Sequence, residues 1–266
     1  MSYHIHKNCR LYYTVAGKGP NLLLLHGLGS HSGDWLPQIE EFTRHYRVLA
    51  LDLPGHGHSQ RWPDGRDYSL SRFAEDVAAV MTTVGMAQAH VVGLSMGGAV
   101  AFQLALTVPA RVSSLTIVNS SPSFVILGTA RAAFWLRKTL VNFLGFKVLG
   151  RVLAKKLFPT NQELQAQFRK DFEQNDKSSY RALMKALDGW DVSPQLSAIE
   201  CPVLVVAADR DYTPVSFKQE YVNALPNARL VVIENAHHAV TAEHPKVFNN
   251  RLADFLGSLN VVQEAG

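Results

Sequence analysis

The sequence predicts an α/β fold with a mostly parallel central sheet, helices on both faces and a helical cap inserted between two strands. The first observation is a series of short, nearly continuous apolar runs, typical of strands that are buried on both faces of a parallel sheet. The second is that segments with helical spacing separate these runs. The third is one long stretch, residues 122–191, in which only helical patterns are found.

The predicted strands follow one another along most of the chain. Residues 10–17 alternate between apolar and polar side chains and then meet the turn signal Gly17-Lys18-Gly19-Pro20, which predicts a hairpin-type strand. Compact runs rich in leucine and valine predict further strands, at residues 22–26, 47–52, 89–94, 114–119, 203–208 and 229–234.

Helical patterns occupy segments between these runs. They are clearest at residues 70–85, 95–109 and 245–259. The stretch 122–191 interrupts the alternation of strand and helix, because it holds helical patterns and no convincing strand. We therefore expect a core formed by residues 1–121 and 192–266, with residues 122–191 as an inserted helical lid or cap.

The composition of the chain argues against several classes of protein. With 47% hydrophobic and 18% charged residues among 266, the chain is expected to be globular. A net charge of +4 is mild and no nucleic-acid-binding motif is present, so we expect no nucleic-acid partner. Cys9 and Cys201 are far apart and have no metal-binding spacing. Neither a disulfide framework nor a metal or cofactor is expected.

The first residues of the chain and one of its apolar runs bear on the expected localisation. The first residues, "MSYHIHKNCRLYYTV", lack the positive-then-apolar layout of a signal peptide. The run "NLLLLHGLG" is too short to cross a bilayer. We expect a soluble cytoplasmic protein.

A serine flanked by glycines stands where one predicted strand ends and a helix begins. The stretch "GLSMG", residues 93–97, matches the pattern G-x-S-x-G, in the strand-then-helix context that this pattern requires. A sharp turn of this kind strains the central residue and brings its neighbours close to the adjacent strand, which glycine tolerates. The alternative is a small residue in a structural turn. We interpret Ser95 as a nucleophile whose hydroxyl is exposed above the sheet.

A serine nucleophile needs a base, and the base needs an acid that orients it. Asp209 and Asp211 follow the predicted strand 203–208, although either of them could instead cap the next helix. The loop after the last predicted strand supplies three histidines, His237, His238 and His244. A neutral imidazole accepts a proton near pH 7, and the order serine, aspartate, histidine suits this type of fold.

Two main-chain amides are candidates for an oxyanion hole. Leu28 lies in the glycine-rich turn of "LLLLHGLGS", directly after a predicted buried strand, and Met96 begins the helix after Ser95. Two amides aimed at a developing oxyanion would stabilise the transition state. His26, at the end of the same apolar run, is interpreted as a structural residue that needs hydrogen-bond partners.

Taken together, the motifs of this chain resemble those of the α/β-hydrolase superfamily. The segments "HGLGSHSGDW", "DLPGHGHS", "GLSMGGAV", "AADRDYTP" and "ENAHHAVTAEHP" occur in the expected order over nearly the whole chain. The resemblance implies that Asp211 is the acid and that His238, which precedes Glu243 by five residues, is the base. It also implies structural roles for Asp52, His56 and Ser59.

The chain departs from the family pattern at two positions near these residues. Ala208 takes the place of a glycine before the acid, and His237 stands where a glycine is usual. A second imidazole at position 237 could shift the pKa of its neighbour or compete for the proton.

The resemblance narrows the reaction. A serine at position 95, rather than an aspartate, disfavours haloalkane dehalogenases and epoxide hydrolases. Ester hydrolysis through an acyl-Ser95 intermediate is the favoured function. The alternatives are a lactonase of the 3-oxoadipate enol-lactone type, a C–C bond hydrolase of aromatic degradation, a cofactor-free haloperoxidase or lyase, and a non-catalytic ligand receptor. Leu94 stands where the C–C hydrolases usually carry asparagine.

The expected cap is basic and aromatic. Residues 122–158 contain seven lysines and arginines (131, 137, 138, 147, 151, 155 and 156) and no Asp or Glu, and they carry Phe124, Phe134, Trp135, Phe143, Phe146 and several leucines. One interpretation is a lid whose aromatic side chains form an apolar acyl pocket while its lysines face solvent. A second is a basic surface that contacts an anionic membrane, and a third is an arginine that reaches a substrate carboxylate. The expected ligand is a small ester with an apolar acyl or aromatic part.

Overall fold

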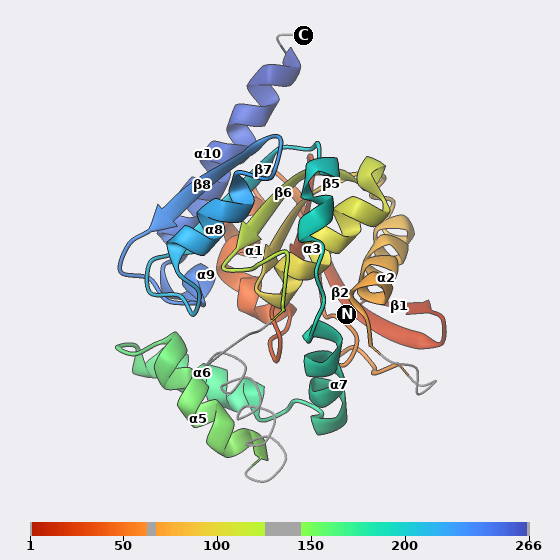
Figure 1. Ribbon diagram of the computed structural model, residues 1–266. Helices are drawn as coiled ribbons and strands as arrows, with labels where there is room; N and C mark the ends of the chain where they lie inside the picture. The colour runs from red at the N-terminus through yellow and green to blue at the C-terminus, as the bar shows by residue number, and fades with distance from the viewer. Residues whose placement is uncertain (1, 63–67, 126–144, 265–266) are drawn as a thin grey trace.

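Eight strands form one sheet at the centre of the molecule (Figure 1). The computed structural model describes residues 2–62, 68–125 and 145–264, with side chains up to residue 259. The strands are β1 (Ser2–His6), β2 (Cys9–Ala16), β3 (Asn21–Leu25), β4 (Arg47–Leu51), β5 (Ala89–Leu94), β6 (Val112–Val118), β7 (Val203–Ala208) and β8 (Ala228–Ile233). Their order is β1-β2-β4-β3-β5-β6-β7-β8, and every pair from β4 onward is parallel. The predicted α/β fold with a mostly parallel sheet is confirmed.

The continuous apolar runs arise because both faces of the sheet are covered. In β3, Leu23 and Leu25 belong to a core cluster that includes residues of α2 (Leu70–Thr83), α3 (Met96–Thr107) and α8 (Val215–Val222). Leu22 and Leu24 belong to a second cluster, with residues of α1 (Leu36–Phe42), α9 (Val240–Glu243) and α10 (Pro245–Glu264). Successive side chains of a strand point to opposite faces, so each of these leucines is fully buried on one face or the other.

The antiparallel edge of the sheet differs from the expected arrangement. β2 forms a hairpin with β1, through a turn at Lys7 and Asn8, whose φ angles are 47° and 63°. The segment 17–20 instead leads into β3, which is separated from β2 by β4. The prediction of a hairpin turn at Gly17–Pro20 is therefore wrong. The true turn contains no glycine, and asparagine tolerates the left-handed conformation there.

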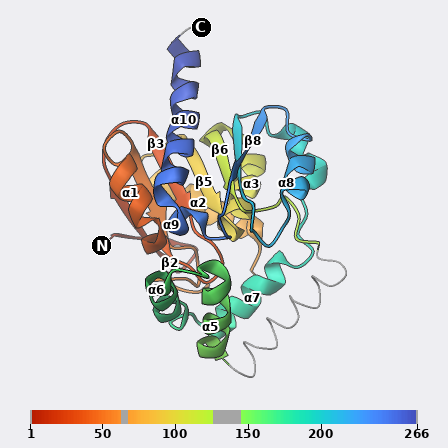
Figure 2. The same cartoon turned by 90° about the vertical axis from the view of Figure 1, so that its left-hand side faces the viewer.

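In the described part of the chain between β6 and β7, the α-helices are α5 (Gly145–Leu157), α6 (Gln162–Phe172) and α7 (Lys177–Leu187). Figures 1 and 2 both show them gathered at one end of the sheet, away from the end at which α10 projects. Ser123 and Asp191 form a single antiparallel bridge where this segment leaves and rejoins the sheet. Within the described part of 122–191 no strand is present. The division of the chain at residues 122 and 191 stays a prediction.

The helix α5 has an apolar inner face and a basic outer face. Leu149, Leu153 and Leu157 are buried, whereas its four cationic residues, Lys147, Arg151, Lys155 and Lys156, are exposed. The remaining cationic and several aromatic residues of the predicted cap lie outside the described residues: Arg131, Phe134, Trp135, Arg137, Lys138 and Phe143. The contact of this surface with an anionic membrane stays a prediction.

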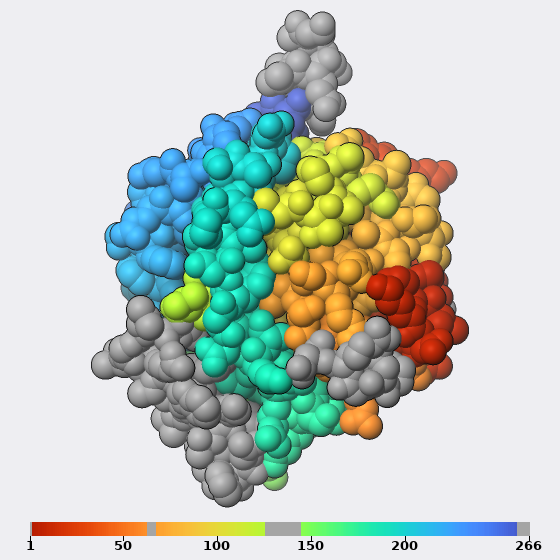
Figure 3. All heavy atoms as spheres, turned by 45° about the vertical axis from the view of Figure 1, so that its right-hand side comes forward, coloured from red at the N-terminus to blue at the C-terminus, as the bar shows by residue number. Residues whose placement is uncertain are grey.

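The chain returns from α7 to the sheet along the surface. Figure 3 shows this segment running between the C-terminal part of the chain and α3. Nε1 of Trp190 donates a hydrogen bond of 3.1 Å to Oε1 of Gln103 on α3, and Leu196 is buried in the core.

Among the helices of the described ranges, none is both long and apolar enough to cross a membrane.

Candidate active site

Ser95 occupies the sharp turn between β5 and α3. Its φ and ψ angles are 54° and −117°, an unfavourable region for a residue with a side chain. The main chain holds this conformation, because Ser95 N donates to the carbonyl of Val118 (2.9 Å) and Ser95 O accepts from Gly98 N (2.9 Å). The side chain makes no capping hydrogen bond to α3. The hydroxyl therefore has no part in forming the helix.

The glycines around Ser95 are required by close contacts of the main chain. A Cβ on Gly97 would lie 2.1 Å from the carbonyl oxygen of Leu25, and one on Gly93 would lie 2.3 Å from that of Gly97. Real Cβ atoms essentially never come so close to another atom. Gly27 faces Ser95 itself, since a Cβ added to Gly27 would lie 3.4 Å from Ser95 Cβ.

The two predicted oxyanion-hole residues come from different segments: Met96 directly follows Ser95 in the chain, and Leu28 lies in the loop after β3. Met96 is the first residue of α3, so its amide has no acceptor within the helix. Leu28 follows Gly27, the residue that faces Ser95. The side chain of Leu28 packs against the apolar cluster of the inserted helices, which includes Phe172 and Tyr180. Met96 and Leu28 thus place their side chains in apolar surroundings.

Asp211 and His238 come together although 27 positions separate them in the chain. Asp211 Oδ1 lies 2.5 Å from His238 Nδ1, and the Asp211 side chain is only 1% exposed. Burial acts to raise the pKa of this carboxyl, but hydrogen bonds and charges from His238 and Lys218 hold it well below its ordinary value. Asp211 is therefore a carboxylate that accepts a hydrogen bond from Nδ1 of the imidazole.

Asp209 has a different partner. Its Oδ1 accepts a hydrogen bond of 3.0 Å from Ala236 N, in the loop that leads to the histidines. The residue at the N-cap of α8 is Pro214, and no side chain caps this helix. Neither Asp209 nor Asp211 therefore caps α8, which was the alternative role for these aspartates in the sequence analysis.

The three histidines that follow β8 differ in their hydrogen-bond partners. His237 pairs with Glu243, through Nδ1 and Oε1 (2.7 Å) and through its amide and Oε2 (2.6 Å). His244 Nε2 lies 3.2 Å from the carbonyl of Asn235. Of the three, His238 is the one with an aspartate from the β7–α8 loop as its partner.

Three further residues of the site were not singled out from the sequence. Lys218 Nζ lies 2.6 Å from Asp211 Oδ2. Asn119 Nδ2 donates to the carbonyl of His238 (2.8 Å). The ring of Tyr212 stacks on that of His238, with centroids 4.4 Å apart. The one sequence signal was the position of Asn119 at the end of a predicted strand, where α/β sheets carry their functional residues.

Polar residues of the neighbouring loops form supporting contacts. His26 accepts a hydrogen bond at Nε2 from Leu53 N (3.0 Å), and its Nδ1 lies 2.8 Å from the carbonyl of Gly27. Asp52 accepts from Ser32 N (2.6 Å) and from His58 N (2.8 Å). These contacts support the structural role expected of His26 and Asp52.

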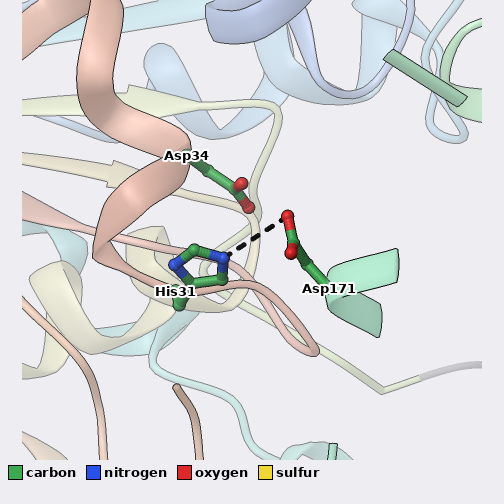
Figure 4. A group of neighbouring side chains, drawn as sticks. All are labelled: His31, Asp34 and Asp171. Atoms are coloured by element: carbon green, nitrogen blue, oxygen red, sulfur yellow. Dashed lines mark ion pairs between the residues drawn. The ribbon is translucent and has the colours of Figure 1, made fainter. Parts of the chain in front are cut away.

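A cluster of three polar side chains, His31, Asp34 and Asp171, lies between the segment after β3 and the inserted helices (Figure 4). His31 Nε2 faces Asp171 Oδ2 of α6 at 3.6 Å, with Asp34 beside them. His31 Nδ1 accepts from Gly33 N (3.0 Å), which places the ring proton on Nε2, the nitrogen that faces Asp171. A metal ligand needs a lone pair at that nitrogen. We therefore interpret the trio as a polar contact between two parts of the chain.

Comparison with known proteins agrees with the motifs. A family model described as the alpha/beta hydrolase fold matches residues 20–245. A protein of Azorhizobium caulinodans, provisionally named a carbamate hydrolase, is 32% identical over 260 residues, which cover 94% of this chain and 96% of that protein. The pimeloyl-[acyl-carrier protein] methyl ester esterase of Aeromonas salmonicida is 32% identical over 258 residues, covering 91% of this chain and 97% of the relative.

A solved structure gives the same picture. The enol-lactonase of Burkholderia xenovorans superimposes with a TM-score of 0.88 at 26% identity, covering 96% of this chain and 100% of that one. Proteins that are similar over their whole length therefore include an esterase and a lactonase.

Proposed function

The chain belongs to the α/β-hydrolase fold family and is a hydrolase, and on that premise we propose that it cleaves a carboxylic ester through an acyl-Ser95 intermediate. The observation that carries the proposal is the hydrogen bond between the buried carboxylate of Asp211 and Nδ1 of His238. In the neutral imidazole this bond makes Nε2 the basic nitrogen. His238 is then suited to accept the proton of a serine.

The first half of the reaction forms the acyl-enzyme. Ser95 Oγ attacks the carbonyl carbon of the ester while its proton passes to His238 Nε2. The carbonyl oxygen becomes an oxyanion, which accepts hydrogen bonds from the amides of Leu28 and Met96. When the tetrahedral intermediate collapses, the bond to the leaving oxygen breaks and the alcohol takes the proton from His238. Asp211 stabilises the imidazolium form throughout.

The second half returns the enzyme to its starting state. A water molecule gives a proton to His238 and attacks the acyl carbon, so that a second tetrahedral intermediate forms. Its collapse breaks the bond to Ser95 Oγ, which takes back the proton. The product is a carboxylic acid.

The inserted helices support a substrate with an apolar acyl or aromatic part. Phe172, Tyr180 and Met184 form a buried apolar cluster, and Leu28 of the proposed oxyanion loop packs against it. We propose that α5, α6 and α7 act as a cap that excludes water from the acyl group. An apolar wall next to the oxyanion hole favours esters whose acyl part is apolar.

Carbamates are the second candidate substrates, because one similar protein is provisionally named a carbamate hydrolase. The same attack on the carbonyl carbon would apply. A carbamate carbonyl receives electron density from its nitrogen and is less electrophilic, so such a substrate depends more strongly on the oxyanion hole.

The test combines labelling with turnover of p-nitrophenyl esters. A fluorophosphonate should modify Ser95 in the folded protein, and Ser95→Ala should abolish labelling and lower turnover by about 10³-fold or more. Ser114→Ala is the control. Ser114 lies near the start of β6, whereas Ser95 contacts the Val118 carbonyl at the end of this strand, so the variant should keep full activity. His238→Ala should lose activity, whereas His237→Ala should keep most of it.

The outcomes separate the functional classes. Turnover of lactones, carbamates or C–C bond substrates above that of esters would assign the reaction to one of those groups. A folded protein whose Ser95 is not labelled, and which turns over none of these substrates, would favour a ligand receptor over an enzyme.

A further inference from the structure

A fully buried lysine lies behind the carboxylate of Asp211. Lys218 belongs to α8, and its side chain is 0% exposed. Its Nζ lies 2.6 Å from Asp211 Oδ2, on the oxygen that does not contact His238. Lysines are almost never fully buried unless a partner compensates their charge, so this position calls for an explanation.

The contacts of Lys218 use all three protons of its ammonium group. Besides Asp211 Oδ2, Nζ donates to the carbonyl oxygen of Thr213 (2.9 Å) and to Thr213 Oγ1 (2.8 Å). Thr213 Oγ1 in turn lies 3.0 Å from Asp211 Oδ2. Oδ2 is therefore held by Lys218 and Thr213, which leaves Oδ1 in line with the imidazole.

We propose that Lys218 is a positioning residue: its ammonium group holds the Asp211 carboxylate toward His238 and offsets part of the negative charge that the imidazole faces. The inference rests on the proposed serine hydrolase function. Lys218 touches neither Ser95 nor the ring of His238 among the described contacts, and it acts through Asp211.

The electrostatic part follows from the sum of charges around the imidazole. A lone carboxylate would favour the imidazolium form of His238. The Lys218 ammonium neutralises that carboxylate at a short distance in a buried setting, so the imidazolium gains less. Removing the charge of Lys218 should therefore let the carboxylate favour the imidazolium more strongly.

The other groups around the site do not replace this charge. Tyr212 stacks on the His238 ring, and the charge of Glu243 is engaged by His237. Burial and the charge of Asp211 raise the pKa of Tyr221, which stays neutral in the core beside Asp211. Among the described residues, Lys218 is thus the lysine or arginine in direct contact with Asp211.

The experiment compares two variants that separate charge from hydrogen bonding. Lys218→Gln keeps a donor for Asp211 without a charge, and Lys218→Met removes both. The acidic midpoint of the kcat/KM profile for an ester should move upward by about one pH unit in both. Lys218→Met should also lower the plateau kcat about tenfold more than Lys218→Gln, because it loses the contact that orients Asp211.

Two controls complete the design. Lys246→Gln removes one exposed charge at the start of α10 and should leave the profile unchanged. Thr213→Val keeps the charge of Lys218 but removes the hydroxyl between Nζ and Oδ2, and should lower kcat without moving the midpoint. If both lysine variants fail to fold, an unchanged kcat in Thr213→Val overturns the positioning role.

The proposed function and this inference fail in different ways. If wild-type turnover does not depend on Ser95 and His238, the serine hydrolase proposal fails. If it depends on both, but the midpoint of Lys218→Gln equals that of the wild type, only the role of the lysine charge is overturned.

Discussion

Asn119 Nδ2 donates a hydrogen bond of 2.8 Å to the main-chain carbonyl of His238. Its Oδ1 accepts a second bond of the same length from the amide of Ala208, at the end of β7. Asn119 follows β6 in the left-handed conformation, with φ of 43°. One side chain therefore joins the ends of two strands to the loop that carries the proposed base.

We expect Asn119→Ala to weaken both the fold and the site. Loss of the hydrogen bonds of this side chain should lower the free energy of unfolding by about 1–3 kcal/mol, as measured by chemical denaturation. Looser placement of His238 should lower kcat about 10- to 100-fold. Asn8→Ala is the matched control, because Asn8 also has a positive φ but lies in the β1–β2 turn. Equal kcat in the two variants would contradict the role of Asn119.

The two aspartates after β7 should differ sharply in a comparison of asparagine variants. Asp211→Asn removes the carboxylate that holds the imidazole and should lower kcat by about 10⁴-fold. Asp209→Asn keeps an oxygen that can accept from Ala236 N, so its kcat should stay within about tenfold of the wild type. Steady-state ester hydrolysis by both purified variants measures this, and equal losses would leave the acid unassigned.

Gly97→Ala should destabilise the protein because the new Cβ would lie 2.1 Å from the carbonyl of Leu25. We expect a loss of about 1–3 kcal/mol in the free energy of unfolding, together with displacement of the Ser95 turn and loss of turnover. Gly257→Ala in α10 is the control, since nothing lies within 4 Å of the position of its Cβ. That variant should be neutral or more stable by up to about 1 kcal/mol. A neutral Gly97→Ala would show that the turn can move.

Stability should fall as the pH drops below 6.5, because His56 is buried without charge. Burial and the neighbouring His26 lower its pKa from 6.5 to about 3. Between these values the unfolded chain binds a proton that the folded chain does not, so each pH unit costs about 1.4 kcal/mol. The contribution is absent above pH 6.5 and grows as the pH falls toward 3.

The variant His56→Phe tests this linkage. It should reduce the slope of unfolding free energy against pH between pH 6 and 5, in denaturant titrations at a series of pH values. The exposed His45→Gln variant should keep the wild-type slope. An unchanged slope in His56→Phe would mean that the stability loss arises elsewhere, for example at His26, whose pKa is also lowered by burial.

Local patterns were enough to predict most of the fold. The run Leu22–Leu25 predicts a strand that is buried on both faces, and alternate leucines indeed belong to the two core clusters. The same kind of pattern missed β1, because its sequence "SYHIH" carries polar side chains at an exposed edge and turns at Lys7-Asn8 without a glycine. Periodicity reports burial, so an edge strand with little burial leaves a weak signal.

By itself, the sequence determined the strands and helices of the core, the turn at Ser95 and the candidates Asp211 and His238, because each depends on a local pattern or a motif. Only the tertiary structure decided that β4 lies between β2 and β3, that Asn119 holds the His238 loop, and that Lys218 pairs with Asp211. These features depend on which chain segments meet when the sheet assembles. A buried lysine in a helix of mixed polarity has no signature in the sequence until its partner is in place.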